Sequence, residues 1–204
     1  MDIKEILIAT NNKGKFKEIS ALLSQINIKS ISTFDLNIEE PEETGETFAE
    51  NSLLKAKYYS QKTNLISLAD DSGISIVDLK NKPGIHSARF AINPETNDKD
   101  FPYAFEKIFN ELSLAKKTAN DKPKAFFICD LALFNPHNNF AINFQGRIDG
   151  HLIYPPKGDN GFGYDPIFVK DGMDKTFGEI EPDLKEKISH RGLAFQKLVD
   201  WLKN

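Results

Sequence analysis

The chain has little cysteine, little net charge and no long apolar run, and each shortage excludes a class of protein. Its one cysteine, Cys129, lies in the apolar run 125–129, so it can form no internal disulfide and is expected in the core. The formal net charge of -4 argues against broad nucleic-acid binding, which needs a basic face. No run approaches transmembrane length, and Asp2, Lys4 and Glu5 stand where a signal peptide needs apolar residues. We therefore expect a cytoplasmic protein without nucleic-acid or membrane partners.

The remaining composition is typical of a globular protein. Hydrophobic residues make up 40% of the 204 residues and charged residues 27%, which is enough for a sizeable core. We find no internal repeat, low-complexity segment or linker. We therefore expect a single domain over residues 1–204.

Apolar periodicity divides the chain into strands and helices. The expected strands are 3–9, 28–34, 65–69, 74–79, 125–134, 140–148 and 167–169, and the expected helices are 16–26, 48–62, 101–114 and 192–203. Strand and helix alternate first, and paired strands follow. This order favours an α/β or α+β mixed fold with a mixed sheet.

The segment Asp70-Asp71-Ser72-Gly73 directly follows the apolar run 65–69. Burying a carboxylate without a partner is costly, so an acidic pair at a strand end is expected to be solvated or to hold a cation. Gly73 is expected to let the backbone turn sharply and to let a ligand approach. The alternative is a polar turn without a ligand, because these residue types dominate turns.

The first loop, residues 10–15, lies where a strand feeds a helix. Backbone N–H groups and the helix dipole then face an incoming anion, to which Lys15 adds a charge and Asn12 an amide. The spacing of a P-loop is absent. An ordinary N-capping loop is the alternative interpretation.

Two segments in the first half carry groups suited to a metal nucleotide. The acidic run 39–43, which ends in Thr44 and Gly45, has the carboxylates of a hard-metal ligand, or of a solvated surface. The turn at 83–89 ends in an arginine that suits a phosphate, or the surface.

Two segments near the C-terminus carry groups suited to a base. The glycines of the segment 161–166 allow close approach of a ligand, and Phe162 would stack on a planar base. His190 and Arg191 stand before the last helix, with Lys185 upstream, and suit base edges or phosphate; capping and surface charge are the alternative. The combined inventory describes a nucleoside triphosphate with magnesium.

Six ordered motifs closely resemble the inosine/xanthosine triphosphate pyrophosphatase family, also called dITP/XTP diphosphatases. They are TNNKGK at 10–15, EETGETFAEN at 42–51, ADDSG at 69–73, PGIHSAR at 83–89, GFGYDPIF at 161–168 and KEKISHRG at 185–192. The resemblance implies an elongated fold: a long mixed, twisted sheet with two flanking lobes and a central cleft, in a homodimer. It implies Mg²⁺-dependent hydrolysis of ITP, dITP and XTP to the monophosphate and pyrophosphate, which clears deaminated purines from the nucleotide pool.

The resemblance also assigns roles to residues. Asp71 would be the general base and would hold the metal together with Glu42, to which the adjacent Glu43 is the alternative. Lys55 would face the phosphates, and Ser72 would touch the substrate. The other substrate-binding residues implied are Thr10, Asn11, Asn12, Lys13, Gly14 and Lys15 at the triphosphate, Phe162, Gly163, Tyr164 and Asp165 around the base, and Lys185, His190 and Arg191 at the purine edge.

Two positions depart from the family pattern. Ser52 stands where a small alanine-like residue is usual, and Ala91-Ile92 replaces a small/Gly pair; neither is an expected catalytic position. A Maf-type pyrophosphatase of pyrimidine or modified nucleotides is the alternative enzyme, and a non-catalytic nucleotide-binding protein is the alternative outside catalysis. Pyrophosphate release from ITP separates these readings.

Overall fold

A computed structural model describes residues 3–34, 36, 38–118 and 121–203. By its contacts the chain divides into two compact units, each assembled from separate stretches of sequence. Unit 1 comprises Met1–Asp71, Cys129–Gly146 and His190–Asn204, and unit 2 comprises Ser72–Ile128 and Arg147–Ser189.

The fold is a mixed α/β fold, as the order of elements predicts. The strands are β1 (Glu5–Ile8), β2 (Lys29–Ser32), β3 (Ser67–Ile76), β4 (Lys82–Pro83), β5 (Lys124–Asn135), β6 (Phe140–Leu152) and β7 (Phe168–Lys170). They form a seven-stranded sheet in the order β2-β1-β3-β5-β6-β7, with β4 paired to β3. β1 runs parallel to β2 and β3, whereas β4 is antiparallel to β3 and β7 to β6, so the sheet is mixed.

Each of the four expected helices has a counterpart in the structure, and two of these begin two or three residues earlier than expected. The α-helices are α1 (Lys13–Gln25), α2 (Phe48–Thr63), α3 (Ser87–Phe90), α4 (Phe101–Leu114), α5 (Pro182–Ile188) and α6 (His190–Lys203), and the 3-10 turns are η1 (Val77–Leu79), η2 (Gly84–His86) and η4 (Asp165–Ile167). The periodicity does not predict α5, although a proline at its first position is a start signal. No helix in the described part of the chain has the length and apolarity needed to cross a membrane.

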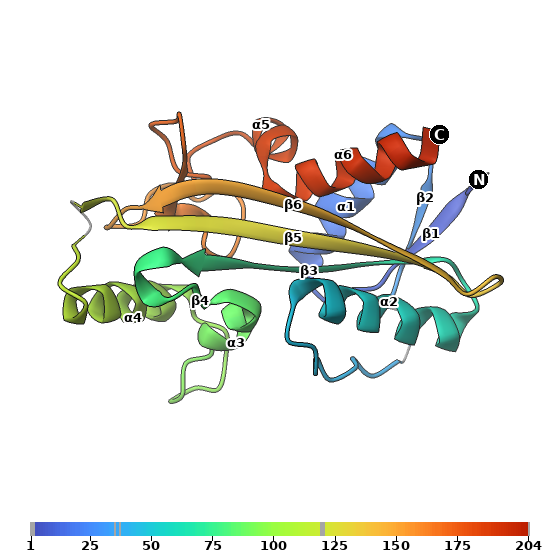
Figure 1. Ribbon diagram of the computed structural model, residues 1–204, viewed down its shortest axis with the longest axis horizontal. Coiled ribbons are helices and arrows are strands. Elements are labelled where there is room, and N and C mark those ends of the chain that lie inside the picture. Colours follow the sequence, from blue (N-terminus) through green and yellow to red (C-terminus); the bar gives the residue numbers. More distant parts are fainter. Residues whose placement is uncertain (1–2, 35, 37, 119–120, 204) are drawn as a thin grey trace. The chain divides into compact units, whose positions relative to one another are not determined.

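In unit 1, helices lie on both faces of the sheet (Figure 1). Side chains alternate between the faces of a strand. Ile6 and Ile8 therefore pack in one core with residues of α1 and α6, whereas Leu7 and Ala9 pack in a second core with residues of α2. Every side chain along β1 after its first residue is thus buried on one side or the other.

Unit 2 has a single core of its own. Helix α4 contributes Phe105 and Ile108, the end of β3 contributes Ile74 and Ile76, and the rings of Phe168 and others pack among them. Strand β6 belongs to unit 1 up to Gly146 and to unit 2 from Arg147, and every second side chain from Ala141 to Asp149 is exposed, which marks a strand with one covered face.

The expected turn at Asp70-Asp71-Ser72-Gly73 is wrong. All four residues lie inside the ten-residue strand β3, which continues from unit 1 into unit 2. Glycine is required at position 73 because of close packing and not because of a turn. A Cβ there would lie 2.4 Å from the Ser87 Oγ and 2.5 Å from the Gly84 carbonyl oxygen. The protein's own backbone, rather than a ligand, makes the close approach at this glycine.

Candidate active site

The adjacent carboxylates of β3, Asp70 and Asp71, lie on opposite faces of the sheet. Because Leu68 packs with α1 and α6 and Ala69 with α2, Asp70 follows the face of Leu68 and Asp71 follows the face of Ala69. Their partners confirm this: Asp70 contacts Lys15 and Arg191, whereas Asp71 contacts Lys55. The two carboxylates therefore have their direct ion-pair partners on opposite faces of the sheet, although the Lys15 charge also acts on Asp71.

On the α2 face, Lys55 lies between two carboxylates. Its ammonium nitrogen is 2.9 Å from Asp71 Oδ1 and 2.6 Å from Glu43 Oε1. Burial disfavours the charged form of Lys55, but Asp71 and Glu43 outweigh it and raise its pKa to about 12. Burial raises the pKa of Asp71 above its usual value, Lys55 and Lys15 oppose this, and Glu43 adds to it. Lys55 is thus a fixed cation beside a carboxylate that is less acidic than usual.

The two candidate metal glutamates lie in different surroundings. Glu43 shares the Lys55 ammonium with Asp71, whereas Glu42 is exposed. The second oxygen of Asp71, Oδ2, is buried and accepts no hydrogen bond from any described residue. An orphaned carboxylate oxygen beside a second carboxylate fits a hard cation. The described residues hold no group of three or more His, Cys, Asp or Glu side chains with metal-site geometry.

The first loop caps its own helix. The Asn12 Oδ1 accepts hydrogen bonds from the backbone N–H groups of Gly14 at 2.9 Å and Lys15 at 3.2 Å, and the Asn12 N–H donates to Thr10 Oγ1. The Thr10 carbonyl in turn accepts from the Thr33 hydroxyl. The capping interpretation of this loop is therefore confirmed. Because the backbone N–H groups of residues 14 and 15 already donate to Asn12, an anion would bind mainly to the side chains of the loop.

On the α1 and α6 face, Asp70 lies between two cations. Its Oδ1 pairs with the Lys15 ammonium and its Oδ2 lies 2.9 Å from Arg191 Nε. Burial by itself would raise the pKa of Asp70, but Arg191 and Lys15 outweigh it and hold that pKa well below its usual range. The Cys129 thiol donates to the same Oδ2 at 3.0 Å, and its own pKa is raised by burial and by Asp70. Cys129 is a core residue, as expected.

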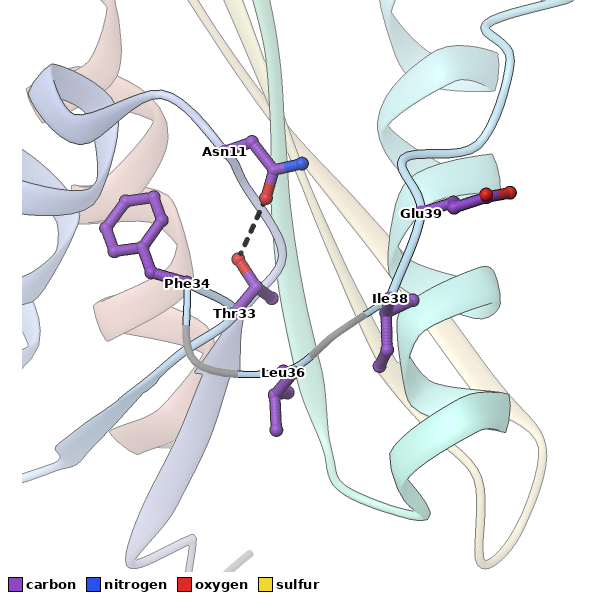
Figure 2. Close-up of a pocket in the computed structure, with 6 residues that line it drawn as sticks. All are labelled: Asn11, Thr33, Phe34, Leu36, Ile38 and Glu39. Atoms are coloured by element: carbon purple, nitrogen blue, oxygen red, sulfur yellow. Dashed lines mark hydrogen bonds between the residues drawn. The ribbon is translucent and has the colours of Figure 1, made fainter.

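A cavity of about 360 Å³ opens beside the first loop (Figure 2). Its lining combines three polar and three apolar side chains: Asn11, Thr33, Phe34, Leu36, Ile38 and Glu39. The Thr33 hydroxyl and Asn11 Oδ1 are 3.4 Å apart, the contact drawn in Figure 2. With an acidic side chain and an apolar wall, this cavity does not suit phosphate groups.

In unit 2, Asp165 organises the glycine-rich loop. Its Oδ2 accepts hydrogen bonds from the Phe162 backbone N–H and from the Lys185 ammonium, both at 2.7 Å. Lys185 also lies over the Phe162 ring, 4.8 Å from its centroid. Gly161 adopts a φ of 76°, and a Cβ there would lie 2.2 Å from Asp165 Oδ2, so glycine is required. The buried Asp165 carboxylate therefore holds Phe162 and Lys185 in a fixed arrangement.

The structure distributes the expected site residues over both units. Unit 1 contains Thr10, Asn11, Asn12, Lys13, Gly14, Lys15, Glu42, Lys55, Asp71, His190 and Arg191, and unit 2 contains Ser72, Phe162, Gly163, Tyr164, Asp165 and Lys185. Within unit 1 the structure groups Lys55 with Asp71, and Lys15 with Arg191 through Asp70. Tyr164 lies in the core of unit 2, where its hydroxyl donates to the Ser87 carbonyl at 2.8 Å.

Three acidic residues at these clusters lack an assigned role in the sequence analysis, or have one only as an alternative. Asp70 and Glu18 bind Arg191, and Glu43 binds Lys55. Asp70 stands out in the sequence beside Asp71, but only its place on a strand shows which cations it faces. Glu18 lies on α1 three residues after Lys15, so it shares a helix face with that lysine.

Comparisons with known proteins give one consistent picture. The model of the Ham1 family matches residues 6–201. A dITP/XTP pyrophosphatase of Zymomonas mobilis is 42% identical over 194 residues, 95% of this chain and 90% of that protein, and one of Caulobacter vibrioides is 44% identical over 194 residues, 95% of each. A solved HAM1 protein from Coxiella burnetii superposes with a TM-score of 0.86 at 35% identity, covering 98% of this chain and 99% of that one.

Proposed function

This chain belongs to the Ham1 family, and from that premise we propose that it hydrolyses ITP, dITP and XTP to the monophosphate and pyrophosphate. The observation that carries the proposal is the cluster of Asp71, Lys55 and Glu43, in which a buried carboxylate oxygen is left without a donor among the described residues. The relatives named as dITP/XTP pyrophosphatases match over nearly their full length, which supports the same substrate class here. The role would be to clear deaminated purines from the nucleotide pool.

We propose Mg²⁺ as the metal. Mg²⁺ is commonly held by one or two carboxylates together with substrate phosphates and water. Asp71 and a neighbouring glutamate offer that small donor set, and Glu43 is the better placed glutamate because it shares Lys55 with Asp71, while Glu42 is exposed. Bound Mg²⁺ would neutralise charge on the phosphates and orient them for in-line attack.

The protein groups then have separate tasks. Lys15 and Lys55 would bind phosphate oxygens. Asp71 would orient the attacking water and accept its proton, the task of a positioned general base. No covalent intermediate is needed, because water attacks the phosphorus directly and pyrophosphate leaves.

We propose that the purine is bound by Phe162 and Lys185, with His190 and Arg191 as further candidates. The Asp165 carboxylate fixes Phe162 and Lys185 in one orientation, which lowers the entropy lost on binding. Hypoxanthine and xanthine carry a carbonyl at C6, where adenine carries an amine. A positioned donor favours the carbonyl, and adenine would leave that donor unpaired. The homodimer remains a prediction from the resemblance, and the cytoplasmic location remains a prediction from the composition and the charged N-terminal residues.

The test is pyrophosphate release from ITP, XTP, dITP, ATP, GTP, UTP and TTP with Mg²⁺, beside Asp71→Asn. We expect release from ITP, XTP and dITP, and a loss of at least about 100-fold in the variant, in line with removal of a general base. Preference for UTP or TTP would instead indicate the Maf-type alternative, and no release from any of them would refute the proposed hydrolysis.

The same assay decides between the two glutamates. Glu43→Gln and Glu42→Gln differ only in which adjacent carboxylate is neutralised. We expect Glu43→Gln to raise the Mg²⁺ concentration needed for half-maximal rate more than Glu42→Gln does. The reverse order would assign the metal to Glu42.

A further inference from the structure

Four charges of alternating sign form a chain inside unit 1. The Lys15 ammonium pairs with Asp70 Oδ1, Asp70 Oδ2 pairs with Arg191 Nε, and Arg191 Nη1 pairs with Glu18. The members come from three elements: Lys15 and Glu18 from α1, Asp70 from β3 and Arg191 from α6. Two cations and two carboxylates balance, so the cluster is neutral as a whole.

Exposure differs sharply along this chain of charges. The side chain of Asp70 is 0% exposed and that of Arg191 is 2% exposed, whereas that of Lys15 is 15% exposed. The backbone of α6 is pressed close to the sheet here, because a Cβ on Gly146 would lie 2.0 Å from the His190 carbonyl oxygen. Arg191 is therefore fixed by its helix and by two carboxylates. The partly exposed cation, which an anionic ligand can reach, is Lys15, whereas the exposed group at the other end of the cluster is the Glu18 carboxylate, 25% exposed.

We propose that Arg191 is a positioning residue for phosphate binding, acting through Asp70 on Lys15. This rests on the proposed function, which places Lys15 at the triphosphate. This role differs from a contact of Arg191 with the purine, because it predicts that Arg191 affects the binding of a phosphate ligand that has no purine.

The physical reason is charge balance at Asp70. A lysine ammonium on a flexible four-carbon stem loses much rotamer freedom when it is held for a ligand. Asp70 restrains the Lys15 ammonium. Because Arg191 also pairs with Asp70 and neutralises part of its charge, the carboxylate holds Lys15 less strongly, and the ammonium stays available to phosphate. The guanidinium reaches Asp70 through Nε and Glu18 through Nη1, two nitrogens held in a rigid planar fork, a spacing that the one nitrogen of a lysine does not offer.

The experiment measures binding of inorganic tripolyphosphate, with Mg²⁺ present, by titration calorimetry. The variants are Arg191→Lys and Lys15→Met, singly and together. Arg191→Lys keeps the charge, so a general electrostatic effect is held constant. Arg147→Lys is the matched control, since Arg147 is an exposed arginine that pairs with Asp149 at 2.6 Å.

We expect Arg191→Lys to weaken tripolyphosphate binding about fivefold in the unaltered chain, comparable to losing one ordinary hydrogen bond. In the Lys15→Met background the same change should have an effect of less than about twofold, because the residue through which Arg191 acts is gone. Arg147→Lys should change neither. This non-additivity is a readout that a merely structural role for Arg191 would not produce.

Other outcomes would overturn the inference. Equal weakening in both backgrounds would mean that Arg191 acts directly or by general destabilisation, and no weakening in either would confine it to other tasks. If Arg191→Lys does not fold, Glu18→Gln replaces it, since Glu18 is the more exposed partner of Arg191, and the same loss of effect in Lys15→Met is required. Absence of tripolyphosphate binding by the unaltered protein would also overturn it, whereas failure of the proposed function is seen separately as absence of pyrophosphate release from ITP.

Discussion

Neutralising Asp70 should destabilise the protein far more than neutralising another buried aspartate one strand away. In Asp70→Asn the shape is kept but the carboxylate charge is lost, and two cations face a neutral amide. Breaking a buried ion pair by removing one partner costs about 3–5 kcal/mol, because the remaining charge stays buried. Lys15 is partly exposed and can turn to water, so most of this cost comes from Arg191, whose side chain is 2% exposed. We expect about 3–4 kcal/mol.

Asp130→Asn is the matched control. Asp130 on β5 is as buried as Asp70, at 2% against 1%, but its partners are neutral. Its Oδ1 accepts from the Ser52 hydroxyl at 2.7 Å and from Asn143 Nδ2 at 2.5 Å. An asparagine oxygen at the same place can accept both hydrogen bonds, so the change should cost about 1 kcal/mol or less.

The assay is thermal unfolding of the three proteins in one buffer. At about 2–4 °C per kcal/mol for a protein of this size, Asp70→Asn should lower the Tm by about 6–16 °C and Asp130→Asn by at most about 4 °C. Comparable losses in the two variants would refute the reasoning, because the cost would then not come from the stranded cations. A loss in Asp70→Asn that Lys15→Met restores would place the cost on Lys15 instead of Arg191.

Two further predictions concern glycine packing and the loop of unit 2. Gly146→Ala would put a Cβ 2.0 Å from the first carbonyl oxygen of α6, so we expect a loss of about 3 kcal/mol in chemical unfolding, the upper end of the usual cost of overpacking. Gly172→Ala, where no atom lies within 4 Å and only the φ of 82° resists, should cost about 1–2 kcal/mol, and the opposite order would contradict the packing argument. Asp165→Asn leaves Lys185 without its buried counter-ion, so steady-state kinetics should show KM for ITP rising about tenfold or more with a smaller change in kcat. An unchanged KM would separate that carboxylate from purine binding.

Much of the fold follows from local patterns in the sequence. Helix α4 has the predicted bounds, because its apolar spacing is regular and Asp100 caps it by accepting from the Tyr103 N–H. Helix α2 begins at a capping box of Thr47 and Glu50. The β5–β6 pair was expected from its two apolar runs around a polar turn, and both strands extend beyond the predicted ends. Helix α5 is short and its apolar spacing is weak, so periodicity could not find it.

The motifs themselves determined the family and the residue types of the site, because the chemistry of a metal nucleotide limits which side chains can bind it. Tertiary structure alone decided how those side chains are paired. Asp70 and Asp71 are neighbours in sequence, yet they face different helices, because β3 runs on through Gly73 instead of turning there. At Gly73 the strand packs so closely against Ser87 that a Cβ would lie 2.4 Å from the Ser87 Oγ, a contact that no local pattern encodes.

The same distinction holds for the acidic partners. Glu42 and Glu43 are indistinguishable by residue type, and only the position of Lys55 on α2 selects Glu43 as the nearer partner of Asp71. Arg191 reads in the sequence as a surface cation or a ligand for the base, and its burial against Asp70 and Glu18 depends on α6 lying over the sheet. Local motifs indicate which charges this protein carries and which ligand suits them. The pairing of these charged side chains depends on the tertiary structure, because strand alternation and helix packing bring together residues that are distant along the chain.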